Sequence, residues 1–420
     1  MSCTMSQSNC EWKECKLGEV CLKITDGAHN SPPTVNTGYP MASVKDMEYN
    51  KINIDSCRRI SSENYNLLVK NGCKPLINDV LIAKDGSYLK HVFDVTEDVD
   101  IVLLSSIAIV RPNTKIIMPK FLKYIFKNPS FRDIVEGNFV TGAVIPRIVL
   151  KDFKNIDILL PPLPEQKAIA SVLSSLDDKI DLLHRQNKTL EAMAETLFRQ
   201  WFVSSPEQAC PESVERVEGE KADEGWEEKP LSFFGEIICG KTPSKKTPYY
   251  FGGDVPFIKI PDMHGNVFIF NTSDSLTEKG KASQMKKTLP PKSICVSCIA
   301  TVGLVSLNVI ESQTNQQINS IVPMKDYYRY YIFLTMKASC DILQSMASGG
   351  TATLNLNTGD FSKIPIPYPG ETALNDFHIN VENLFEKIFV NSRQIRTLEK
   401  LRDNLLPKLM SGEVRVLNHD

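Results

Sequence analysis

The 420-residue sequence lacks the features that mark membrane proteins and exported proteins. Its longest apolar stretches, such as residues 101–110, are interrupted and too short to cross a bilayer. The opening MSCTMSQSNC has no basic start followed by an apolar run, so it is not typical of a secretion signal. We therefore expect a cytoplasmic protein with no membrane partner.

Catalytic signatures are also missing. The sequence has no GxxxxGK[ST] phosphate loop, no GxGxxG dinucleotide motif, no HExxH zinc motif and no GxSxG nucleophile motif. It has no Asn/Asp-Pro-Pro-Tyr/Phe stretch of the kind that amino-methyltransferases use, and its six histidines suggest no metal cluster. These absences favour a recognition protein over an enzyme, with no catalytic residues and no cofactor of its own.

Cysteine is present, but not in a pattern that predicts disulfides. Eleven cysteines, an odd number in a chain without an export signal, are typical of reduced thiols. Cys295 and Cys298 have the spacing of a zinc or redox pair, yet no second pair matches them, and a structural zinc site needs four ligands. We expect two buried small side chains here, and a zinc site is the less favoured alternative.

Excess charge of one sign is absent overall, because the formal net charge is −2. Its distribution is uneven. Residues 12–160 carry 20 Lys/Arg and 17 Asp/Glu, a net +3, and residues 226–368 carry 14 and 11, again +3. Residues 204–225 carry 2 and 7, a net −5. An acidic linker therefore separates two mildly basic lobes, a pattern that permits DNA binding without requiring it.

What the sequence does contain is an internal duplication. Residues 142–198 recur as residues 350–406, offset by 208 positions without a gap, and the front of each half shows a fainter similarity. The repeat is much longer than solenoid units of roughly 20–50 residues, so it indicates domain duplication.

Each copy ends in a long heptad pattern. The first seam comprises Ile169, Leu173, Leu176, Ile180, Leu183, Asn187, Leu190, Ala194 and Leu197. The second comprises Phe377, Val381, Leu384, Ile388, Asn391, Ile395, Leu398, Arg402 and Leu405. Such steps of three and four residues predict two long helices.

One asparagine in each seam predicts how the helices pair. A lone buried amide is costly unless a partner satisfies it, so we expect Asn187 to face Asn391. In that register the helices run antiparallel, and the residue numbers of two facing side chains add up to 578. Trp201 is then opposite Phe377. The alternative is that each helix packs only on its own lobe.

The predicted fold class is therefore α+β, with two pseudo-repeated lobes separated by an intramolecular antiparallel coiled coil. The expected domains are a first recognition domain (1–160), a central helix (161–204), an acidic linker (205–225), a second recognition domain (226–370), a C-terminal helix (371–414) and a tail (415–420). Strands are expected at 80–83, 101–110, 257–260 and 294–299, and helices at 119–127 and 325–344.

Polar loops supply the candidate binding residues. The loop at 240–250 is basic, rich in hydroxyl groups and aromatic at its tip, which suits contact with phosphates and base edges, although an ordinary solvated loop has the same composition. The candidates there are Lys241, Thr242, Ser244, Lys245, Lys246, Tyr249 and Tyr250. The matching loop of the first lobe offers His29 and Asn30. Weaker candidates are Lys84, Ser87, Lys90, Asn315 and Gln316, whose more favoured role is to tie loops together.

The arrangement resembles the specificity subunits of type I restriction–modification systems over essentially the whole chain. The segments ILLPPLPEQKAI (158–169) and LFRQWFV (197–203) look like the central region of that family, and LLPKLMSGEV (405–414) looks like its C-terminal end. The loop segments DGAH (26–29) and KTP (241–243) resemble those of recognition domains, less specifically. The second copy departs from the pattern because Ala373-Leu374 replaces Glu165-Gln166.

The resemblance implies a non-catalytic subunit in which each lobe reads half of a split double-stranded DNA target. The paired helices would set the spacer and dock two methyltransferase subunits, for which Glu165, Gln166 and Trp201 are candidate contacts. S-adenosylmethionine, ATP and Mg²⁺ would belong to the modification and restriction subunits. Because the helix copies align without gaps and the lobes do not, the target should be asymmetric.

Two other functions remain open on the sequence alone. One is a coiled-coil scaffold whose lobes bind proteins and not DNA. The other is the recognition half of a fused nuclease–methyltransferase, although no methyltransferase motif lies within the 420 residues.

Overall fold

The structure is a computed structural model that describes residues 12–48, 51–85, 89, 91–138, 140–141, 147–148, 150–203, 226–348 and 354–416. The expected acidic linker at 205–225 lies outside the described residues. The chain forms two compact units. Unit 1 comprises residues 1–180 and 397–420, and unit 2 comprises residues 181–396, so each unit contains a globular lobe and parts of both long helices.

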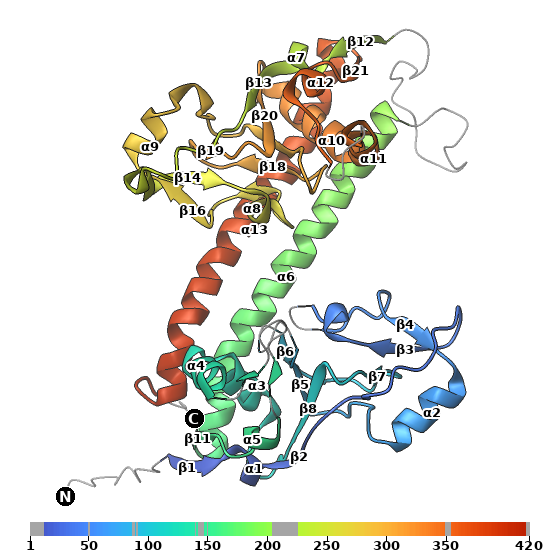
Figure 1. Cartoon of the computed structure of the whole chain (residues 1–420), viewed down its shortest axis with the longest axis vertical. Helices are drawn as coiled ribbons and strands as arrows, with labels where there is room; N and C mark the ends of the chain where they lie inside the picture. Colours follow the sequence, from blue (N-terminus) through green and yellow to red (C-terminus); the bar gives the residue numbers. More distant parts are fainter. Residues whose placement is uncertain are drawn as a thin grey trace, which may run out of the picture. The chain divides into compact units, whose positions relative to one another are not determined.

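Lobe 1, the globular part of unit 1, contains two sheets (Figure 1). The four-stranded sheet has the order β2-β8-β5-β6, and the three-stranded sheet has the order β4-β3-β7. The strands are β2 (Cys21–Asp26), β3 (Tyr39–Ala42), β4 (Arg58–Ile60), β5 (Val80–Ala83), β6 (Val92–Asp94), β7 (Val102–Leu103) and β8 (Ile107–Pro112). Helix α3 (Pro119–Lys127) contributes Phe121, Leu122 and Phe126 to a core with one face of the larger sheet, while the other face packs toward the smaller sheet.

Lobe 2, the globular part of unit 2, has the same plan. Its sheets have the orders β13-β20-β17-β18-β15 and β16-β14-β19. The strands are β13 (Gly235–Cys239), β14 (Phe251–Ile258), β15 (Phe268–Ile269), β16 (Asp274–Leu276), β17 (Ile294–Ser297), β18 (Val305–Asn308), β19 (Gln313–Thr314) and β20 (Ile318–Pro323). Helices α10 (Arg329–Ala338) and α11 (Cys340–Ala347) contribute to its core.

Strand pairing shows that the duplication extends through the lobes. In both, a middle strand of the smaller sheet pairs antiparallel with one neighbour and parallel with the other, as β3 does with β4 and β7, and β14 does with β16 and β19. Each lobe is also closed by a pair of terminal strands. These are β1 (Lys13–Lys16) with β11 (Asp157–Leu160), and β12 (Glu227–Pro230) with β21 (Pro365–Tyr368).

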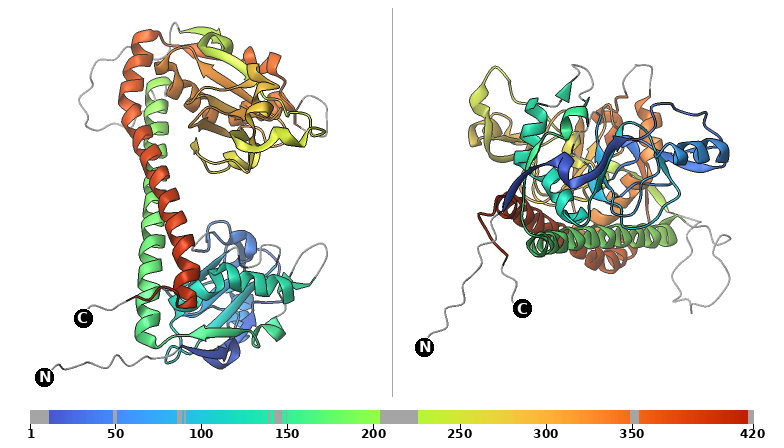
Figure 2. Two further views of the ribbon diagram at one scale, coloured as in Figure 1. Left: turned by 90° about the vertical axis from the view of Figure 1, so that its left-hand side faces the viewer. Right: turned by 90° about the horizontal axis from the view of Figure 1, so that it is seen from below.

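The two heptad segments form the long helices α6 (Leu163–Phe202) and α13 (Glu371–Ser411). Every residue of both predicted seams is buried or half-buried, as a helix-pairing face requires. In each unit the two helices lie side by side and antiparallel (Figure 2). The predicted fold class is thus confirmed.

The predicted amide pair is present in unit 2. Asn391 Nδ2 donates to Asn187 Oδ1 at 2.9 Å, and Asn187 Nδ2 donates to Ser392 Oγ at 3.1 Å. Trp201 lies against Phe377, with ring centroids 5.8 Å apart. Residue numbers of the facing side chains therefore follow the predicted register.

The shorter elements differ from expectation mainly at their ends. The predicted strand at 80–83 and helix at 119–127 match β5 and α3. The single strand expected at 101–110 is instead β7 and β8 separated by a turn, because Ser105 and Ser106 interrupt the apolar run. The helix expected at 325–344 is likewise broken between α10 and α11, at Ser339. No helix within the described ranges is long and apolar enough to span a membrane.

Candidate nucleic-acid interface

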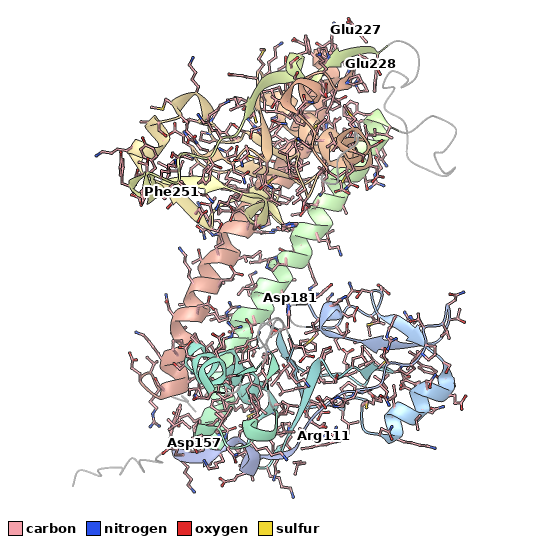
Figure 3. All side chains as sticks on the ribbon, in the orientation of Figure 1. Arg111, Asp157, Asp181, Glu227, Glu228 and Phe251 are labelled. Carbon is pink, nitrogen blue, oxygen red and sulfur yellow. The ribbon has the colours of Figure 1, made fainter. Side chains whose placement is uncertain are left out.

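Lobe 2 contains an open concavity of about 850 Å³. It lies between the loop that follows β13 and the ends of the three-stranded sheet. Its lining residues are Thr242, Lys245, Pro248, Phe251, Phe257, Lys259, Asp274, Asn315, Gln316 and Gln317. Phe251 opens β14 at the edge of the lobe (Figure 3). Apolar rings at the wall, with amides, hydroxyls and charges around them, suit recognition of a polar aromatic ligand such as a base edge.

Glycine at position 240 places the loop against the sheet. A Cβ atom there would lie 2.0 Å from the Asn315 carbonyl oxygen, so only glycine allows this approach. The Gly240 N–H donates to the Ile318 carbonyl at 3.0 Å, and the Lys241 N–H donates to the Thr314 carbonyl at 2.9 Å. Gln284 holds the other side of the loop by donating to the Lys241 carbonyl at 2.6 Å. The loop is therefore anchored at its base.

The structure brings the two predicted segments of lobe 2 together at this concavity. Thr242 Oγ1 donates to Gln316 Oε1 at 2.7 Å, which joins the loop at 240–250 to the turn before β20. Most of the predicted loop side chains are accessible. Lys241, Ser244, Lys245, Lys246, Tyr249 and Gln316 are exposed, and Thr242 and Tyr250 are half-buried.

Asn315 is an exception among the predicted contacts. Its side chain is 8% exposed, its Nδ2 donates to Gln317 Oε1 at 2.8 Å, and its Oδ1 accepts from the Gln317 N–H at 3.1 Å. The amide thus shapes the turn, which is the favoured of the two roles expected for Asn315, and it is not available as a direct DNA contact.

Four wall residues of the three-stranded sheet region were not among the candidates from the sequence. Phe251 and Phe257 lie on β14, Lys259 follows directly after it, and Asp274 begins β16. Lys259 Nζ and Asp274 Oδ2 form an ion pair at the concavity. No motif links these positions in the sequence, because strand pairing alone makes them neighbours.

Lobe 1 has an equivalent loop after β2. A Cβ atom at Gly27 would lie 2.2 Å from the Leu103 carbonyl oxygen, as at Gly240. The Ala28 N–H donates to that carbonyl at 2.7 Å, as Lys241 does to Thr314. The predicted residues His29 and Asn30 follow and are exposed, with His29 Nε2 3.1 Å from Asp26 Oδ1.

Lys84 does not belong to an accessible surface. Its side chain is 6% exposed and its ammonium forms an ion pair with Asp26 beneath the loop. The predicted DNA contact of Lys84 is therefore wrong, because a buried, paired ammonium is not available to a phosphate. Ser87 and Lys90, predicted in the same segment, lie outside the described residues.

Gln166 is likewise a structural residue. It is fully buried, and its Oε1 accepts from the Met118 N–H while its Nε2 donates to the carbonyls of Ile116 and Pro161, at 2.8 to 3.0 Å. Its predicted contact with a partner subunit is wrong, because the amide fastens the start of α6 onto lobe 1.

The other two predicted docking residues also make contacts within their own units. Glu165 accepts from Trp12 Nε1 at 3.0 Å and pairs with Arg415 at 3.1 Å. Trp201 is half-buried against Phe377 and Phe202. A docking role for Glu165 and Trp201 stays a prediction.

Cys295 and Cys298 lie on or next to β17 and are buried. Burial raises the pKa of Cys295 to about 12 and that of Cys298 to about 11. Both thiols are therefore protonated at neutral pH. Within the described part of the chain, no group of three or more His, Cys, Asp or Glu side chains is placed to hold a metal ion.

Comparison with known proteins identifies the family of this architecture. The family model described as "Type I restriction modification DNA specificity domain" matches residues 9–192 and again residues 223–373. The HindI specificity subunit of Haemophilus influenzae is 34% identical, over 96% of this chain and 100% of that protein. The MjaIX specificity subunit of Methanocaldococcus jannaschii is 30% identical over 71% of this chain and 70% of that protein.

A solved structure has the same fold. The S subunit of a type I restriction–modification system from M. genitalium superposes with a TM-score of 0.58, at 16% identity, over 97% of this chain and 98% of that one.

Proposed function

Since the chain belongs to the family of type I restriction–modification specificity subunits, we propose that it is the DNA-recognition subunit of such a complex. Each lobe reads one half of an asymmetric, bipartite target in double-stranded DNA. The chain itself has no catalytic role. S-adenosylmethionine, ATP and Mg²⁺ are bound by the modification and restriction subunits that assemble with it.

The observation that carries this proposal is the repeated placement of a polar loop over a two-sheet lobe. In lobe 2 the exposed Lys245 lines a concavity with amide and aromatic walls, and the exposed Lys241 and Lys246 belong to the same loop. Lysines suit the phosphate backbone, and amides suit base edges. The equivalent loop of lobe 1 carries different side chains, and this difference supports two unlike half-sites.

The paired helices offer a surface for two identical partners. Leu182 and Met193 of α6 are 38% and 49% exposed, and their duplicated counterparts Val390 and Leu401 of α13 are 46% and 45% exposed. Two matching pairs of exposed apolar side chains suit one modification subunit each. We propose these residues as the docking contacts in place of Gln166.

The test is motif-level sequencing of adenine methylation in a host with and without this gene. Loss of methylation at one split, asymmetric motif is expected when the gene is removed. An unchanged methylome, with the modification subunit expressed, would count against DNA recognition by this chain.

The loop contribution can be measured separately through salt dependence. We expect Lys245→Gln to weaken DNA binding by the complex on all sequences and to lower the slope of log K against log salt by about 1, because one phosphate contact is lost. Lys363→Gln removes the same charge from an exposed site outside the concavity, so it should leave the slope unchanged. If the two variants have equal slopes, Lys245 makes no phosphate contact and this loop is not part of the DNA interface.

A further inference from the structure

The two lobes place side chains of opposite charge at one equivalent position. We propose that this position, Arg58 in lobe 1 and Asp274 in lobe 2, determines specificity, and that Arg58 reads a guanine in the half-site of lobe 1. The inference rests on the proposed function and adds to it a residue and the base that this residue recognises.

Strand registers establish the equivalence. Arg58 is the partner of Met41 across β3 and β4, and Asp274 is the partner of Phe257 across β14 and β16. Met41 and Phe257 are also matched on their other side, where each pairs in parallel with the first residue of a short strand, β7 or β19. The position is therefore the same in both lobes.

The position lies beside the polar loop in both lobes. In lobe 2, Asp274 and Phe257 line the concavity together with Lys245 of the loop. In lobe 1, Arg58 Nη1 donates to the Pro32 carbonyl at 2.9 Å, and Nη2 lies 2.9 Å from Met41 Sδ. The guanidinium thus lies between β3 and the loop that follows Gly27, which corresponds to the loop over the concavity of lobe 2.

Arg58 differs from Arg111 of the same lobe in lacking an anionic partner. Arg111 binds Asp79 through two nitrogens, at 2.7 and 2.8 Å. No carboxylate of the described residues lies within 4.0 Å of the Arg58 guanidinium, and its buried Nε has no hydrogen-bond partner. Half-buried charge without compensation is costly, so the site favours a ligand rich in acceptors.

Guanine has the matching chemistry. Its major-groove edge presents two acceptors, O6 and N7, which an arginine fork can bind together. A carboxylate could not accept from that edge, and Asp274 in lobe 2 is in addition paired with Lys259. The exchange of Arg58 for Asp274 therefore makes the two lobes prefer different bases at this position.

The experiment selects DNA from a randomised duplex library with the full chain in complex with its modification subunits. We expect Arg58→Gln to lose the preference for one guanine by roughly 5- to 150-fold, in one half of the motif only. Arg58→Lys should lose most of the same preference, because it keeps the charge but not the fork. The unchanged half of the motif reports that the complex is folded and bound.

Arg59→Gln is the matched control, because it removes the same charge from the next residue of β4, which points to the other face. It should retain the complete motif. A wild-type complex that selects no motif would contradict the proposed function. Two results would overturn the assignment of Arg58 alone, with a wild-type complex that does select a motif. Either Arg58→Gln selects the same motif as wild type, or it binds all sequences more weakly by the same factor, as the loss of a phosphate contact would cause.

Discussion

Asn187 and Asn391 show how much a single polar side chain decides in a helix seam. Apolar residues with heptad spacing pair in many registers, but a buried amide is satisfied in few of them. Here Asn391 donates a hydrogen bond to Asn187 at 2.9 Å, and Asn187 in turn donates one to Ser392. The amide pair therefore selects one register of α6 against α13.

We predict that Asn391→Leu lowers the free energy of unfolding by about 1–3 kcal/mol, because Asn187 keeps a buried amide with one partner removed. The double variant Asn187→Leu/Asn391→Leu should recover most of that loss. Urea denaturation measures both. Gln186→Leu, at an exposed neighbouring position, is the control and should change stability by less than about 0.5 kcal/mol.

The correction at Gln166 leads to a second prediction at this scale. Gln166→Leu introduces the leucine that the second copy has at the corresponding position, Leu374. It also leaves backbone groups of Met118, Ile116 and Pro161 without their hydrogen-bond partner. We expect a loss of about 2–4 kcal/mol in urea denaturation. Gln200→Leu, on an exposed face of α6, should be neutral. Full stability with weakened binding of the modification subunit would restore the docking role instead.

At the scale of elements, a charged cluster joins three helices of unit 1. Asp177 of α6 accepts from Tyr124 of α3 at 2.9 Å and from Arg402 of α13 at 3.0 Å, and Lys127 Nζ lies 3.5 Å away. Burial is the main cause that lowers the pKa of Lys127 to about 8; the nearby cations Lys123 and Arg402 act in the same direction, and Asp177 offsets only part of the shift. Arg402 thus acts as a charged residue in a seam position that the heptad pattern treats as apolar.

This pKa predicts a pH dependence of stability. The folded chain releases the Lys127 proton near pH 8, whereas the unfolded chain holds it until about pH 10.5, so stability should rise between these values and be constant below them. We expect the difference in unfolding free energy between wild type and Lys127→Met to grow in favour of wild type by on the order of 2–3 kcal/mol from pH 7.5 to pH 10. Taking the difference cancels the cysteine thiols, which titrate in the same range. A difference independent of pH would show that Lys127 stays charged.

The regular elements were predictable where burial is repetitive. The seams of α6 and α13 have one apolar side chain every three or four residues, and β5 is a short, fully buried run, so periodicity alone identifies them. The broken elements were not predictable, because the turn at Ser105 and Ser106 depends on β7 pairing with β3 while β8 pairs with β2. The apolar run at 101–110 contributes one strand to each of two sheets, and the packing of the lobe determines where the first strand ends and the second begins.

At the scale of the whole molecule, the duplication has kept the helices alike and allowed the lobes to differ. The seams must match each other, so their spacing is constrained. The side chains of the lobes at Arg58 and Asp274 are under no such constraint. Arg58 and Asp274 can therefore differ without disturbing the strand register that they share.

Helix length should set the spacer if the proposed function holds. Inserting seven residues after Ile180 and seven after Thr397 adds one heptad to each helix at facing positions and preserves the seam. It adds about 10.5 Å, or roughly three base pairs. We expect the methylated motif to gain about three base pairs of spacer while both half-sites stay the same. An unchanged spacer in long-read methylation sequencing would contradict this role of the helices.

The sequence by itself determined the duplication, the two long helices, their antiparallel register and the family. These depend on periodicity and on long unbroken similarity, which are visible along the chain. Only the tertiary structure decided that Lys84 and Gln166 are buried, that the loop at 240–250 meets Gln316, and that Arg58 stands where Asp274 stands. The physical reason is that burial and strand register join residues far apart in the chain, and no local pattern encodes those neighbours.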